Sequence, residues 1–84
     1  MAHRITRHND GELMYVATEP NGVLDHADFV HPFIAVDYDA AGRLIGFSAS
    51  GPAIDATLTI HRDFWRDPSM LVEKLAQADD LIAA

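Results

Sequence analysis

Cysteine is absent from this 84-residue chain, and lysine and arginine are scarce. Without thiols the protein has no disulfide, no cysteine nucleophile and no thiolate ligands for zinc or an iron–sulfur cluster. Six basic residues stand against 13 acidic ones, which gives a formal net charge of −7 at pH 7. This balance opposes direct nucleic-acid binding, which needs clustered lysine and arginine. It fits a protein whose partner is basic.

Long apolar stretches are also absent, and no basic segment leads into a hydrophobic one as in a secretion signal. We therefore expect a cytoplasmic protein without membrane contact. Residues 1–84 are too few for two independent cores, so the chain is predicted to be a single domain. Its composition, 49% hydrophobic and 23% charged, is typical of globular rather than disordered chains.

Glycine and proline divide the first half of the chain into short pieces, as expected for hairpins. A strand over residues 4–7 ends at N-D-G (residues 9–11), whose members tolerate the left-handed backbone of a tight turn. A second strand is predicted over residues 12–18, followed by a turn at residues 19–22. Residues 23–32 are predicted to form a polar connector.

The strongest local signal is a β-hairpin over residues 33–50. Asp39 and Gly42 suit a type I turn closed by a left-handed glycine, which leaves residues 40–42 as a three-residue loop. This loop sets the expected register: Asp39 opposite Arg43, Tyr38 opposite Leu44, Asp37 opposite Ile45, Val36 opposite Gly46, and Ala35 opposite Phe47.

That register places large apolar side chains on both faces of the hairpin. One face carries Ile34, Val36, Tyr38 and Leu44, and the other carries Phe33, Ile45, Phe47 and Ala49. A single helix covers only one face of a small sheet, so the second apolar face is expected to need another cover.

The C-terminal third is predicted to contain one more strand and one helix. Residues 56–61 alternate and are rich in β-branched side chains, which favours a strand. Asp67 and Pro68 are a good N-cap and first residue for an amphipathic helix over residues 68–83. The predicted fold class is therefore α+β: a small antiparallel sheet, a meander of hairpins, with a C-terminal helix packed on one face.

Two motifs carry a resemblance to a known family: L-M-Y-V at residues 13–16, with the aromatic Tyr15, and V-D-Y-D-A-A-G-R-L-I-G at residues 36–46. Over about residues 5–50 the chain resembles the family called domain of unknown function 2283, small bacterial β-hairpin proteins. It departs from the family's pattern at Phe47 and Ser48, where isoleucine and glutamate are usual. The resemblance implies an antitoxin-like or other partner-binding role without an established activity.

Two groups of side chains could carry chemistry. Asp25, His26, Asp28 and His31 are of the types that bind zinc or another divalent metal, although solvated surface residues explain the same letters better. Asp37 and Asp39 lie two residues apart on one strand, as in some acid–base pairs. We interpret them, with Gly42 and Arg43, as an ion-paired turn.

No catalytic set is complete, so we expect no enzyme and no cofactor. We predict a non-catalytic interaction or regulatory module, which binds itself as a homodimer or a basic protein partner through the uncovered sheet face. Two alternatives are an acidic, phage-type inhibitor of a nucleic-acid-binding or defence complex, and a small metal-dependent hydrolase. Phe64 and Trp65 are either a partner anchor or part of the core. The predicted partner-binding residues are Tyr15, Ile34, Val36, Tyr38, Leu44, Phe64 and Trp65.

Overall fold

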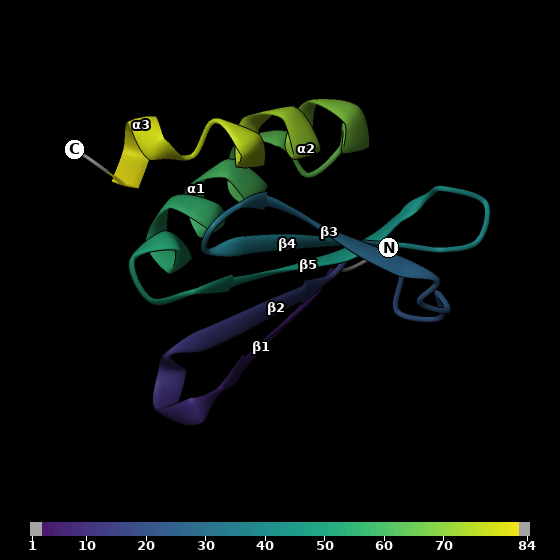
Figure 1. Cartoon of the computed structure of the whole chain (residues 1–84), viewed down its shortest axis with the longest axis horizontal. Coiled ribbons are helices and arrows are strands. Elements are labelled where there is room, and N and C mark those ends of the chain that lie inside the picture. Colours follow the sequence, from purple (N-terminus) through teal and green to yellow (C-terminus); the bar gives the residue numbers. More distant parts are fainter. Residues whose placement is uncertain (1–2, 83–84) are drawn as a thin grey trace.

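The computed structural model describes residues 3–82 and shows an α+β fold, with a five-stranded antiparallel sheet and helices above one face (Figure 1). The strands are β1 (Arg4–His8), β2 (Leu13–Ala17), β3 (His26–His31), β4 (Ile34–Tyr38) and β5 (Leu44–Ser50). Their spatial order is β1-β2-β5-β4-β3, so β1 and β3 form the two edges. The helical elements are η1 (Asn9–Gly11), η2 (Gly51–Ala53), α1 (Ile54–Phe64), α2 (Pro68–Ala76) and α3 (Asp79–Ile82).

The hydrophobic core lies between the helices and one side of the sheet, which we call the covered face. Two rows of buried side chains cross the three central strands there: Met14, Ala49 and Ile34 in one row, and Val16, Phe47 and Val36 in the other. The helical layer closes this core, chiefly with Ala53, Ile54, Ile60, Leu71, Leu75 and Ala78.

The β4–β5 hairpin has the predicted turn but not the predicted register. Tyr38 lies opposite Leu44, as expected, but Ile45 is then an extra residue in β5. Such a β-bulge shifts every following pair by one, so the pairs predicted beyond Tyr38 are wrong. The observed pairs are Asp37 with Gly46, Val36 with Phe47, Ala35 with Ser48, and Ile34 with Ala49.

This one-residue shift also overturns the prediction of two apolar faces. A slip of one residue moves a strand's side chains to the opposite face, because they alternate with a period of two. Phe47 and Ala49 therefore join Ile34 and Val36 on the covered face. Ile45 is almost buried but lies outside the core cluster. The other side of the sheet, the outer face, loses Phe47 and Ala49 and keeps Leu13 and Tyr15 of β2, which alternate with the buried Met14 and Val16.

Residues 56–61 form the middle of α1 and not the predicted strand. Over the longer window, Ile54, Thr57, Ile60 and Phe64 recur at helical spacing, and the first three are buried. Within six residues, helical spacing cannot be distinguished from the alternation of a strand. Packing against the sheet stabilises the helix in this case. Pro52 lies at the beginning of the helical η2 segment, which leads directly into α1.

The C-terminal helix begins as predicted and is interrupted once. The side chain of Asp67 accepts a hydrogen bond from the backbone N–H of Met70 at 3.1 Å, which satisfies one free donor of the first turn. α2 ends at Ala76, and Gln77 leaves helical geometry before α3 begins at Asp79. The predicted range of 68–83 thus becomes two helices, and residue 83 lies outside the described part of the chain.

The segment predicted as a polar connector contains the edge strand β3. Edge strands tolerate polar side chains because they are open to solvent, which hides their strand pattern. Only residues 18–25 connect β2 to β3, and they pack against Ile45 on β5. The backbone N–H groups of Thr18 and Glu19 both donate to the carbonyl of Ile45, and a β-carbon at Gly22 would lie 2.6 Å from its side chain.

Candidate functional site

The outer face carries one cross-strand cluster, formed by Tyr15 on β2, Gly46 on β5 and Asp37 on β4. The ring of Tyr15 reaches across the backbone of Gly46, where a β-carbon would overlap the hydroxyl. Burial raises the pKa of Tyr15 to about 12, and the charge of the hydrogen-bonded Asp37 carboxylate adds to the effect. The cluster thus packs side chains of three neighbouring strands against one another on the outer face.

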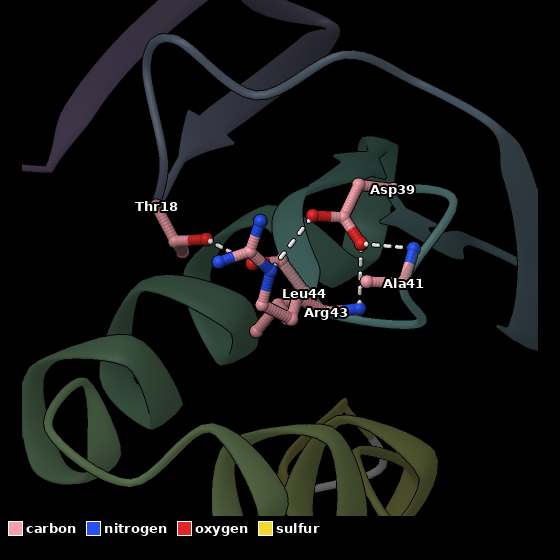
Figure 2. A network of polar contacts seen from close by, with 5 residues as sticks. All are labelled: Thr18, Asp39, Ala41, Arg43 and Leu44. Carbon is pink, nitrogen blue, oxygen red and sulfur yellow. Dashed lines mark hydrogen bonds and ion pairs between the residues drawn. The ribbon is translucent and has the colours of Figure 1, made fainter.

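The β4–β5 turn is held by the carboxylate of Asp39, which accepts three hydrogen bonds (Figure 2). The backbone N–H groups of Ala41 and Arg43 donate to one oxygen at 2.9 Å each, and the Arg43 Nε donates to the other at 2.9 Å. The bond from the Arg43 N–H is the main reason why the pKa of Asp39 lies below its ordinary value. The ion pair of the turn is therefore formed by Asp39 and Arg43, whereas Asp37, which was also assigned to it, contacts Tyr15 instead.

Five of the seven side chains predicted to bind a partner instead lie in or against the core. Ile34 and Val36 are completely buried beneath the helices, so a docking face through these two residues is a wrong prediction. Tyr38, Leu44 and Phe64 are partly buried against the same core. The remaining two are Tyr15, on the outer face, and Trp65, just beyond α1.

The residues suggested as metal ligands are not brought together. His26 hydrogen-bonds to the carboxylate of Asp25 at 2.8 Å, at the beginning of β3. His31, at its other end, is buried and has both nitrogens engaged: Nδ1 accepts from the backbone N–H of Phe33, and Nε2 donates to Asp79 of α3 at 2.5 Å. Within residues 3–82, no three metal-ligating side chains converge.

Trp65 belongs to an aromatic cluster that the sequence did not suggest. His3, ahead of β1, lies edge-on to the Trp65 ring and shares a hydrogen bond of 2.7 Å with His61 of α1. The Arg66 guanidinium lies 4.8 Å from the centre of the Trp65 ring. Burial, together with the neighbouring imidazole of His3, holds the pKa of His61 below its ordinary value. These contacts fasten the first strand to the end of α1.

The largest exposure of apolar side chains occurs along β3 and the connector that enters it. Phe29 of β3 is 77% exposed, and Val23 and Leu24 are 78% and 58% exposed. His26, Ala27 and Asp28 of the same strand are exposed as well. We call residues 25–29, together with the ring of Tyr38, the β3 edge. In the sequence, this surface is indicated by apolar residues within a segment that is otherwise polar.

The β3 edge is also strongly acidic. Between residues 8 and 42 the chain has seven acidic residues and no lysine or arginine. Burial and the charge of Asp28 raise the pKa of Tyr38, which places this carboxylate close to the phenol. The His26 ring stacks on Tyr38 with 5.2 Å between ring centres. Aromatic rings beside carboxylates are favourable surroundings for a guanidinium or ammonium group.

Comparisons with known proteins return no matching family model, no matching curated protein and no matching solved structure. The resemblance to domain of unknown function 2283 therefore stays a prediction. Among residues 3–82, no helix is both long enough and apolar enough to cross a membrane.

Proposed function

We propose that the protein is a non-catalytic interaction module that binds a basic, extended segment of a protein along the β3 edge. The observation that carries the proposal is that an open edge strand displays Phe29, which is 77% exposed, directly after the exposed carboxylate of Asp28. Edge strands present unpaired backbone N–H and C=O groups, and an added strand satisfies them.

Charge and side-chain chemistry support a basic occupant. Asp25 directly precedes β3, Asp28 lies in its exposed first half, and no lysine or arginine occurs from residue 8 to residue 42. Tyr38 and His26 provide stacked rings beside these carboxylates. The proposed partner surface is thus an edge of the sheet. The sequence had suggested the uncovered sheet face instead. A partner-binding role is also what the resemblance to the family implies.

A short synthetic peptide, R-V-T-R-V, tests the proposal, with E-V-T-E-V as the matched acidic control. We expect the basic peptide to shift the amide NMR signals of residues 26–29 and the acidic peptide to leave them unchanged. Asp28→Lys should weaken binding by about tenfold, because it replaces attraction by repulsion at the strand. Asp63→Lys changes the net charge equally on the exposed side of α1 and should leave binding intact. Failure of the basic peptide to shift these signals contradicts the proposal.

A further inference from the structure

The two edges of the sheet carry opposite charge. β1 holds Arg4 and Arg7 and no acidic residue, whereas the β3 edge holds Asp25 and Asp28 and no lysine or arginine. The two strands have similar lengths, five and six residues. In both cases the charged residues are three positions apart, which gives the two edges matching charge patterns.

From this match we infer that the strand bound at the β3 edge is β1 of a second copy of this chain. The inference rests on the proposed function, since it names the occupant of the same edge. Neighbouring strands alternate in direction through the order β1-β2-β5-β4-β3, so β1 and β3 run in the same direction. A second copy placed beside the first in the same orientation therefore adds its β1 parallel to β3.

The register of this parallel pair follows from the charges. When Arg7 lies beside Asp28, Arg4 lies beside Asp25, because both pairs have the same spacing. The faces also agree: Arg7 is paired with Met14 and Asp28 with Val36, so both belong to the covered face. Thr6 and Ala27, which then lie side by side, both belong to the outer face.

A closed two-fold dimer, the form expected from the sequence, gains no such complementarity at either edge. A β3–β3 pair places carboxylates on both strands, and a β1–β1 pair places guanidinium groups on both, which is unfavourable across a seam. The head-to-tail contact instead leaves a free edge at each end, so copies add one after another. With a twist of ~20–25° for each strand, successive copies rotate by roughly a third of a turn.

The contact is small, because a single strand pair buries less than the ~1,200 Å² of a standard interface. We expect reversible association that grows with chain concentration up to about 1 mM and weakens in about 0.5 M salt. Sedimentation velocity measures it directly. Arg7→Glu or Asp28→Lys should each leave monomers, whereas the double variant should associate again. Arg62→Glu and Asp63→Lys, an exposed ion pair on α1, are the matched controls and should associate as the unchanged chain does.

The absence of cysteine allows a direct test of the register. Oxidation of a mixture of Thr6→Cys and Ala27→Cys chains should give mainly the mixed 6–27 disulfide. Within one chain these strands are four strand spacings apart, about 19 Å, which is too far for a disulfide. Ala76→Cys, on the exposed side of α2, is the control partner and should not cross-link to residue 6.

Two results overturn the inference: preferential 27–27 or 6–6 cross-links, or a monomer at about 1 mM. If the chain stays monomeric while R-V-T-R-V still shifts the signals of residues 26–29, only the occupant is wrong and the proposed function stands. If the peptide also fails, both proposals fall.

Discussion

The hydroxyl of Tyr15 occupies the space that a β-carbon would need at Gly46, so the aromatic side chain on β2 and the glycine on β5 require each other. Both residues belong to the motifs on which the family resemblance rests, and Asp37, which contacts the same hydroxyl, is the third. The residues of these motifs therefore pack three strands against one another on the outer face.

Replacing Gly46 by alanine should destabilise the fold by about 1–3 kcal/mol, the usual range for overpacking. The new β-carbon would overlap the Tyr15 hydroxyl and lie 2.9 Å from the carbonyl oxygen of Val16. Urea unfolding measures the change. Ser48→Ala, on the same face of β5, should stay within about 0.5 kcal/mol. Adding Tyr15→Ala should recover part of the loss, and full tolerance of Gly46→Ala would contradict this account.

Thr57→Val should stabilise the protein by about 1 kcal/mol. The Thr57 side chain is completely buried in α1, and its hydroxyl has no hydrogen-bond partner among residues 3–82. Valine has nearly the same shape without the unsatisfied polar group, so its burial avoids a desolvation penalty. Thermal and urea unfolding provide the measurement, with the less buried Thr59→Val as control. A loss of stability in Thr57→Val would show that the hydroxyl has a partner in solution.

Both tyrosines should ionise at a higher pH than an unperturbed phenol. The pKa of Tyr15 is raised to about 12, and the pKa of Tyr38 is raised by burial and by Asp28. Because the folded-state pKa of Tyr15 is raised, its contribution to the free energy of unfolding is fully present below the unfolded-state pKa near 10. This contribution is lost as the pH rises from there towards 12. Absorbance at ~295 nm follows the ionisation of the phenols. Asp37→Asn should lower the Tyr15 midpoint, and an unchanged midpoint would remove Asp37 from the explanation.

Stability should fall as the pH drops below 6.5, because the pKa of His61 is lowered in the folded protein. Below pH 6.5 the unfolded chain binds a proton at His61, whereas the folded chain binds it only when the pH falls to the lower folded-state pKa. Comparing urea unfolding at neutral and mildly acidic pH tests this. His61→Gln should show a smaller loss than the unchanged chain. His8→Gln, an exposed imidazole on β1, is the control. Equal losses in all three proteins would contradict the assignment.

The fold class, the β4–β5 turn and the start of α2 could be predicted from the sequence because each depends on local chemistry. Asp39 and Gly42 determine their turn within four residues, and Asp67 caps its own helix. The assignment of residues 56–61 failed because a short amphipathic segment fits two periods, and the sheet beneath α1 selects one of them.

The candidate site was predicted at the wrong place for a related reason. The exposed Phe29 and the acidic Asp25 and Asp28 of the β3 edge are visible in the sequence, but only the strand order shows that this segment is a free edge. The contact of His31 with Asp79 joins residues 48 positions apart, and no local pattern announces such a pairing.

Ile45 has a role in this fold out of proportion to its size. If Ile45 were paired with Asp37 in a regular ladder, every later residue of β5 would shift by one position, and Phe47 and Ala49 would turn towards water while Ser48 turned inward. The bulge at Ile45 thus determines which side chains of β5 face the core and which face solvent.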